Sequence, residues 1–211
     1  MAVKVGIINY HMGNIQSVVN ALTFLGHIPL VSSDPNKLKD ADAYILPGVG
    51  AFAQAMKNLE HEALIEFLNE EVLFKKKPIL GICLGMQLMT NYSLELGEHK
   101  GFGWIDAQVL PIPISSHLRV PHVGWNNLEI YEKEPLFSRL NKTSHFYFDH
   151  SFYVYSNDKS IITATCNHGV EMCVSFRKDN IFATQFHPEK SQTSGLKLLR
   201  NFLDYCEASL W

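Results

Sequence analysis

A series of short, nearly continuous apolar runs most constrains the fold of this chain. Residues 3–10 form one run, residues 42–52 hold a second that ends in a Pro-Gly-x-Gly loop, and residues 78–83 hold a third. Such runs are typical of strands that are buried on both faces of a parallel sheet. Apolar residues recur at helical spacing after the first run, up to Gly26, and again over residues 53–74. Strands that alternate with helices predict an α/β fold with right-handed crossovers.

The second half of the chain has a different pattern. From Gly101 to Phe186 the segments are short, aromatic and β-like, which predicts antiparallel strands added to the parallel sheet. Turns are expected at Asn126-Asn127, Asn157-Asp158 and His168-Gly169, and residues 194–206 are expected to form a closing amphipathic helix. A short strand is expected at residues 28–32, and Asn14 is expected to cap the first helix. The chain contains no repeat or linker, so we predict a single doubly wound domain over residues 1–211.

Composition narrows the class of protein. The 211 residues are 46% hydrophobic and 18% charged, enough apolar content for a substantial core. A net charge of −3 gives no basic field for nucleic acid, and no run reaches the roughly 18 apolar residues that span a bilayer. The four cysteines form no C-x-x-C pair, which favours a reduced, cytoplasmic protein. Cys166 and Cys173 could face each other across the expected turn, but a reducing cytoplasm argues against a disulfide between them.

The third apolar run ends in an unusual cysteine. The sequence "GICLG" places Cys83 between Gly81 and Gly85, directly before a helix-like stretch. A lone cysteine in a strand is most often a small buried hydrophobe. The flanking glycines instead suit a sharp strand-to-helix turn that lifts one side chain out of the sheet as a nucleophile. Cys83 would also sit at the start of a helix, where the dipole favours an anion.

A second unusual motif, "FHPEK", follows the apolar strand "NIFATQF". Proline fixes its own φ and keeps the preceding residue extended, so His187 and Glu189 are expected to point to the same side. A carboxylate can then hold the imidazole in one tautomer, and such a pair activates a thiol. Taken alone, His-Pro-Glu is most often an exposed surface turn.

These two motifs and the Pro-Gly-x-Gly loop all lie at predicted carboxyl ends of strands, where doubly wound sheets form their sites. A glycine-rich loop by itself is most often a plain turn. Beside a nucleophile, it can turn backbone N–H groups towards a developing oxyanion, and the amide that follows the nucleophile, on Leu84, is the natural second donor. The three loops together predict a cysteine-dependent acyl-transfer site.

The set of motifs resembles the triad glutamine amidotransferases. "GICLGMQLM" and "HPE" are similar to their nucleophile and His-x-Glu motifs, and the resemblance is closer still to the glutaminase subunits of imidazole glycerol phosphate synthase. The segments "NYHMGNIQSV", "LPGVGAF", "VPHVGWN", "FYFDHSFYV" and "QFHPEKSQ" carry it from about Asn9 to Phe202. The resemblance implies a flavodoxin-like class I amidotransferase domain that needs no cofactor and no metal.

The resemblance also implies roles for particular residues. Cys83, His187 and Glu189 match the catalytic triad, and the oxyanion donors would be Leu84 and the Val49-Gly50 loop. Positions that match glutamine-binding residues are Gly48, Gln87, Glu95, His150 and Ser151, of which Glu95 fits its usual local pattern least well. Ammonia becomes non-nucleophilic ammonium in water, and the family passes it to a (β/α)8 cyclase subunit that makes imidazole glycerol phosphate and AICAR in histidine biosynthesis. Positions that match the contact with this partner are Asn14, Trp125, Tyr147 and Lys190.

Two positions depart from the family pattern, and other functions stay open. His11 stands where glycine is common, and Asp149 stands where an apolar residue usually precedes the histidine; both are expected near the site rim or the partner face. One alternative is a paralogue that supplies ammonia to another enzyme, such as one making amidino-modified surface sugars. Others are a regulatory subunit without turnover and a cysteine hydrolase acting on peptides. The intact triad argues against the regulatory subunit, and Gln87 argues against the peptide hydrolase.

Overall fold

The computed structural model describes residues 3–114, 119–141 and 143–210. The strands of the first half are β1 (Val5–Ile8), β2 (Leu30–Ser32), β3 (Ala43–Gly48), β4 (Ile79–Cys83), β5 (Thr90–Ser93), β6 (His99–Lys100) and β7 (Ile105–Pro111). Those of the second half are β8 (His122–Asn127), β9 (Glu129–Ile130), β10 (His145–His150), β11 (Phe152–Tyr155), β12 (Ile162–His168), β13 (Val170–Lys178) and β14 (Ile181–Thr184). The α-helices are α1 (Ile15–Phe24), α2 (Pro35–Leu38), α3 (Phe52–His61), α4 (Leu64–Leu68), α5 (Leu84–Leu88) and α6 (Gln192–Ala208). Two 3₁₀ turns cover Lys159–Ile161 and Pro188–Lys190.

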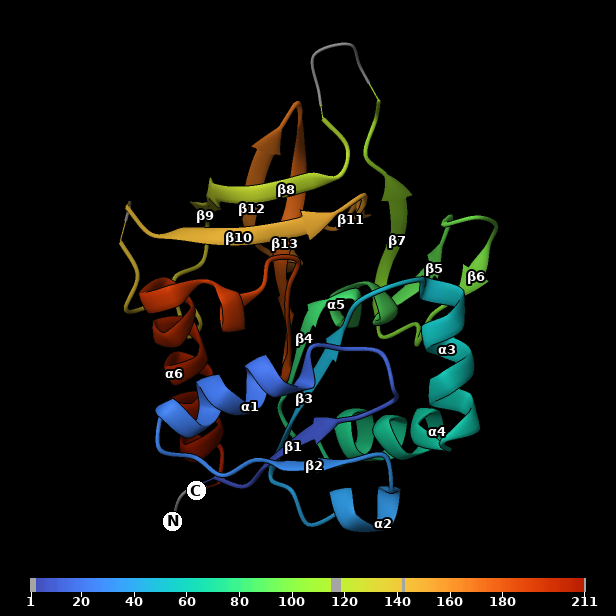
Figure 1. Cartoon of the computed structure of the whole chain (residues 1–211), viewed down its shortest axis with the longest axis vertical. Helices are drawn as coiled ribbons and strands as arrows, with labels where there is room; N and C mark the ends of the chain where they lie inside the picture. The colour runs from blue at the N-terminus through green and yellow to red at the C-terminus, as the bar shows by residue number, and fades with distance from the viewer. Residues whose placement is uncertain (1–2, 115–118, 142, 211) are drawn as a thin grey trace.

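One mixed sheet forms the centre of the molecule (Figure 1). Its main path runs β2-β1-β3-β4-β14-β13-β11-β7-β5-β6. The neighbours from β2 to β14 pair in parallel, as do β5 and β7, whereas β13 and β11 pair antiparallel with their neighbours. The predicted class, a mainly parallel sheet with antiparallel strands added by the second half, is confirmed.

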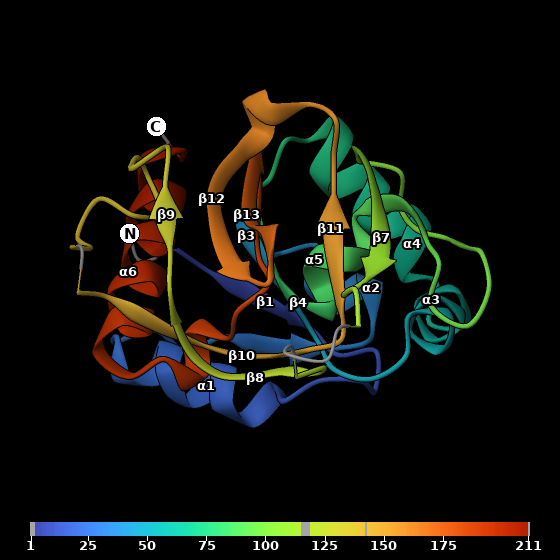
Figure 2. The same cartoon turned by 90° about the horizontal axis from the view of Figure 1, so that it is seen from above.

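Helices cover both faces of the parallel strands, as a doubly wound sheet requires. Helices α1 and α6 bury Leu22 and Leu199 in one core cluster, together with the β1 residue Ile7. Helices α3 and α4 bury Leu59 and Leu68 in a second cluster on the opposite face. Figure 2 shows α1 and α6 on one side of the sheet and α3 and α4 on the other.

A separate two-stranded ribbon, β8 with β10, crosses one end of the main sheet (Figure 1). The ribbon corrects one sequence prediction, because Asn126 and Asn127 do not form a turn. They lie within β8 and pair with Phe146 and His145 of β10. Asparagine's preference for turns is overridden here by cross-strand pairing. The expected turn at Gly169 is present and joins β12 to β13.

Four smaller expectations differ from the structure. The helix expected over residues 53–74 is broken near Ala63, whose φ of 54° is left-handed, and it continues past α4 as a π-helix over Asn69–Phe74. Asn14 occupies the cap position of α1, but its side chain makes no capping hydrogen bond. The strand expected at residues 28–32 spans only Leu30–Ser32. Cys166 pairs with Met172 and not with Cys173, and both thiols are free.

Candidate active site

The strand register brings the three unusual loops together. Gly48, the last residue of β3, pairs with Cys83, the last residue of β4. On the other side of β4, Thr184 of β14 pairs with Ile82. The loops that leave these three strands therefore meet at one edge of the sheet, as the sequence predicts.

Cys83 forms the predicted sharp turn. It ends β4 and directly precedes α5, and its φ of 54° with ψ of −109° is a conformation that L-residues rarely adopt. Residues held in such a conformation store strain and cluster at active sites. The turn does not lift Cys83 into solvent, because only 6% of the residue is exposed. Its side chain lines the floor of a cavity and also packs against the core cluster of α1 and α6.

Close packing explains why glycine stands on each side of Cys83. A Cβ on Gly81 would lie 2.8 Å from the Gly85 carbonyl oxygen and 2.8 Å from Met89 Cε. The first turn of α5 therefore rests directly on the end of β4, and a side chain at Gly81 would separate the two. A side chain at Gly85 would instead meet the backbone of Leu46 in β3. This close approach explains the G-x-C-x-G spacing.

His187 and Glu189 form the predicted pair. His187 Nδ1 lies 2.7 Å from Glu189 Oε1, and each side chain is 2% exposed. The His187 amide donates to the Tyr147 carbonyl of β10, and Ser191 Oγ donates to the His187 carbonyl, so the backbone is held at both ends. Burial lowers the pKa of His187, but hydrogen bonds with Cys83 and Glu189 outweigh it and raise the pKa to about 10. An imidazolium held beside a cysteine favours the thiolate.

A cavity of about 340 Å³ opens above this pair, within the range of small-molecule sites. Most of the sequence-predicted site residues line it: Val49, Gly50, Cys83, Leu84, Gln87, Glu95, His150, Ser151 and His187. Gly48 is not among the residues that line the cavity, and a Cβ there would meet Tyr10 Oη at 2.2 Å. Glu95 accepts a hydrogen bond from the Phe52 amide at 2.7 Å, which ties its carboxylate to the start of α3. Asp149 also lines the cavity, as expected for the site rim.

The sequence did not reveal a chain of hydrogen bonds behind the cavity. His150 Nδ1 lies 2.8 Å from the Phe152 carbonyl, which can only accept, so this nitrogen carries the proton. His150 Nε2 then accepts from His122 Nδ1 at 2.9 Å, and His122 Nε2 accepts from Asn126 Nδ2 at 3.3 Å. Burial is the main cause that lowers the pKa of His122 to about 3 and that of His150 to about 4. Both imidazoles are therefore neutral and fixed in one tautomer.

These lowered pKa values predict acid sensitivity. In the unfolded chain both histidines take up protons below about pH 6.5, whereas the folded state resists protonation down to about pH 4 for His150 and about pH 3 for His122. Their contribution to stability is complete above pH 6.5 and is lost as the pH falls towards the folded values. When the pH falls from 7.5 to 5, we expect each of these two histidines to lower the free energy of unfolding by about 2 kcal/mol. His187, with its raised pKa, acts in the opposite sense: its contribution to stability is complete below about pH 6.5 and is lost as the pH rises from there towards about 10.

The substitution His122→Asn keeps a donor near His150 and removes one titrating ring. Urea unfolding of the variant should show a stability loss between pH 7.5 and pH 5 about 2 kcal/mol smaller than that of the wild type. Lost stacking on Phe148 and His168 lowers its stability at both pH values, so the difference between the two pH values is the readout. Equal losses in the two proteins would contradict the assignment of acid sensitivity to His122.

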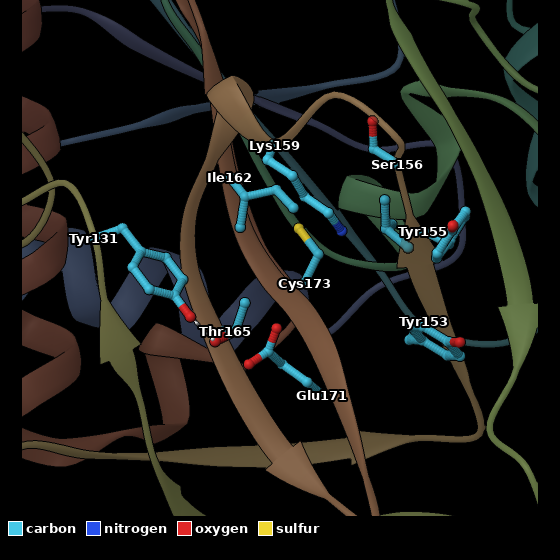
Figure 3. Close-up of a pocket in the computed structure, with 10 residues that line it drawn as sticks. Tyr131, Tyr153, Tyr155, Ser156, Lys159, Ile162, Thr165, Glu171 and Cys173 are labelled. Atoms are coloured by element: carbon cyan, nitrogen blue, oxygen red, sulfur yellow. Dashed lines mark hydrogen bonds between the residues drawn. The ribbon is translucent and has the colours of Figure 1, made fainter.

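A larger hollow of about 460 Å³ lies elsewhere, between β11 and β12 and over β13. Figure 3 shows three tyrosines, Lys159 and Glu171 around it, with the Tyr131 hydroxyl against Thr165. Burial raises the pKa of its Cys173 thiol to about 12, and no histidine stands among its lining residues. This hollow offers space but lacks the thiol–imidazole pairing of the smaller cavity.

Three of the four residues predicted to contact a partner lie together beside the cavity. Lys190 Nζ sits 5.6 Å from the centroid of the Tyr147 ring, and the rings of Tyr147 and Trp125 are 6.0 Å apart. Trp125 is 48% exposed on β8, so its ring is not part of the core. His11, the other departure from the family pattern, is exposed and lies 3.3 Å from Glu62.

Over residues 3–114, 119–141 and 143–210, no helix has the length and apolarity needed to cross a membrane. The same residues contain no group of three or more histidine, cysteine or acidic side chains placed to hold a metal ion.

Comparison with known proteins assigns the family. The family model described as "Glutamine amidotransferase class-I" matches residues 7–206. The chain is a class-I glutamine amidotransferase. Among curated members, "Imidazole glycerol phosphate synthase subunit HisH 1" of Campylobacter jejuni is 48% identical over 198 residues, which cover 94% of this chain and 98% of the relative. "Imidazole glycerol phosphate synthase subunit HisH 2" of Vibrio vulnificus is 47% identical over 203 residues, which cover 96% of this chain and 94% of that relative.

These relatives place this amidotransferase among the HisH-type members of its class. A solved structure, "Structure of PurLQS from Thermotoga maritima", superposes with a TM-score of 0.75 over 97% of this chain and 99% of that one. At 20% identity, that likeness supports the fold alone. The expected fold, family and amidotransferase activity are thereby confirmed, whereas the roles of individual residues and the single-domain assignment of residues 1–211 stay predictions.

Proposed function

We propose that this amidotransferase is the glutaminase subunit of imidazole glycerol phosphate synthase and that Cys83, His187 and Glu189 are its catalytic triad. The observation that carries the proposal is the buried His187–Glu189 pair, whose imidazole lines the same cavity as Cys83, beyond the carboxyl ends of the adjacent strands β14 and β4. Nucleophilic catalysis needs a thiol close to a base, and a further group that orients the base.

In the proposed reaction Cys83 Sγ attacks the side-chain amide carbon of glutamine. His187 takes the thiol proton and passes it to the leaving nitrogen, while Glu189 holds the ring in the required tautomer. Ammonia leaves, and a glutamyl thioester remains on Cys83. Water, deprotonated by His187, then attacks the thioester, which releases glutamate and restores the thiol. The amides of Leu84 and of the Val49-Gly50 loop are the proposed donors to the oxyanion of both tetrahedral intermediates.

The cavity walls supply the proposed glutamine-binding groups: the side chains of Gln87 and Glu95 and the backbone of His150-Ser151. Their placement around one cavity with Cys83 supports this assignment. Gly48 has a structural role in the proposal, because its missing side chain lets β3 approach Tyr10 and Leu84.

The proposed partner is the (β/α)8 cyclase subunit, which would receive the ammonia and use it to make imidazole glycerol phosphate and AICAR in the cytoplasm. Trp125, Tyr147 and Lys190, with Asn14, are the proposed contact residues. Their support is the exposure of Trp125 and its clustering with the other two aromatic and basic groups beside the cavity.

Among the alternatives, a paralogue that feeds another enzyme is not favoured, because relatives at 48% and 47% identity are both named as subunits of imidazole glycerol phosphate synthase. The intact pairing of His187 and Glu189 disfavours a regulatory subunit without turnover. Membership of the amidotransferase class disfavours a peptide hydrolase.

The test is glutamate release from glutamine, by the chain alone and with purified cyclase subunit and its nucleotide ligand from the same organism. Strong stimulation that is lost in Cys83→Ala is the expected result. Basal turnover without stimulation would reject the proposed partner and keep the triad. A folded protein that releases no glutamate in either condition would reject the triad.

A further inference from the structure

A buried glutamine stands next to the nucleophile and has no role in the triad. Gln185 directly follows β14 and lies two residues before His187, where the backbone bends at Gln185 and Phe186. It is completely buried, and its amide N–H donates to the Val174 carbonyl, which fixes the backbone to β13. Its side-chain Nε2 lies 3.7 Å from Cys83 Sγ, and its Oε1 lies 3.0 Å from Gln87 Nε2.

The direction of these hydrogen bonds is determined by the Phe152 carbonyl. This oxygen can only accept, so the Gln87 atom 3.0 Å from it must be the amide nitrogen. The same nitrogen lies 3.0 Å from Gln185, whose facing atom must therefore be the oxygen. That leaves the NH₂ group of Gln185 as the part that faces the sulfur. A flipped Gln185 amide would place two NH₂ groups against each other.

We propose that Gln185 is a further catalytic residue, whose side-chain amide donates a hydrogen bond to the Cys83 sulfur and stabilises its ionised, nucleophilic form. This inference rests on the proposed role of Cys83. A donor to a charged acceptor makes a stronger bond than one between neutral groups, so the contact favours thiolate over thiol. The donor is neutral, so it adds no charge that would compete with His187.

The same bonds define what Gln87 offers to a ligand. Both N–H donors of its amide are used by Phe152 and Gln185, so only its Oε1 remains. Gln185 thus connects the nucleophile to the cavity wall that is proposed to hold glutamine. Its loss should reduce the rate of the chemical step more than the affinity for substrate.

The test compares Gln185→Met, which keeps the length and removes the donor, with Gln185→Glu, which is isosteric and places a carboxylate beside the sulfur. Alkylation of Cys83 by iodoacetamide is followed between pH 5 and pH 10, by mass spectrometry of the peptide that carries it. The pH of half-maximal rate should rise by about one unit in the methionine variant and by more in the glutamate variant. With cyclase present, kcat should fall by about 10- to 100-fold and KM should change by less than about threefold.

Gln108→Met is the matched control, because Gln108 in β7 accepts a hydrogen bond from the Tyr92 hydroxyl and does not line the active-site cavity. It should leave the alkylation profile and kcat unchanged. If the Gln185 variants lower only the melting temperature and alkylate like the wild type, Gln185 is a packing residue and the inference is overturned. Should the methionine variant fail to fold, Gln185→Leu takes its place, because it also removes the donor without adding a charge beside the sulfur. A wild-type protein that releases no glutamate would instead overturn the proposed function. The alkylation assay can still be read in that case, because it does not depend on glutamine turnover.

Discussion

Cys83→Ala is expected to lower glutamine hydrolysis by about 10⁴-fold or more, because alanine has no thiol that could form the thioester. The rate should be measured as glutamate release with the cyclase subunit present. Folding should change little. The side chain lines the cavity, so alanine removes one sulfur and leaves the strained backbone as it was, at a cost of about 1 kcal/mol or less.

The variant Cys83→Gly tests the strain separately. Glycine adopts the φ of 54° without a steric penalty, although it normally destabilises a strand or helix by about 0.5–1 kcal/mol relative to alanine. In thermal unfolding, the glycine variant should therefore be at least as stable as the alanine variant. A glycine variant that is clearly less stable, or an alanine variant whose melting temperature falls by many degrees, would show that Cys83 is an ordinary packed residue.

Gly85→Ala is expected to prevent folding. A Cβ at this position would lie 1.8 Å from the Leu46 carbonyl oxygen and 2.9 Å from the Leu46 carbonyl carbon. Both atoms are backbone of the central strand β3, so no side-chain rotation can relieve the clash. We expect a loss of more than about 4 kcal/mol, seen as insoluble protein or as an unfolded circular dichroism spectrum.

Gly13→Ala is the matched control for this prediction. A Cβ there would meet its nearest neighbour, Ile15 Cδ1, at 3.5 Å, an ordinary contact distance. This variant should fold with a melting temperature close to that of the wild type. A soluble, cooperative Gly85→Ala protein of similar stability would mean that α5 does not rest on β3 as closely as the structure places it.

The parts of the fold that the sequence predicts are those determined by local pattern. Continuous apolar runs marked β1, β3 and β4, because a strand buried on both faces has no polar side to interrupt the run. The break after α3 was missed, since nothing in the sequence marks Ala63 as left-handed. The strand β8 was missed for a similar reason. Its asparagines favour turns in isolation, and only pairing with β10, which lies almost 20 residues further along the chain, keeps them extended.

The same division holds for the site. Cys83, His187 and Glu189 could be predicted because their motifs are short and each implies its own backbone geometry. Gln185 and the His122–His150 pair could not, because their roles depend on atoms of β8, β10 and α5 that meet only in the folded chain. One signal was available for Gln185: it lies two residues before His187 and directly follows an apolar strand, so it is placed close to the predicted base.

Covalent labelling with a diazoketone analogue of glutamine tests the central claim, that Cys83 is the nucleophile of a glutamine site, most directly. The protein is incubated with the analogue and the cyclase subunit, with and without excess glutamine, and is then mapped by mass spectrometry. We predict one adduct per chain, on Cys83, that glutamine suppresses and that Cys83→Ala does not form. An adduct on Cys166, Cys173 or Cys206 in place of Cys83, or labelling that glutamine does not suppress, would contradict the account.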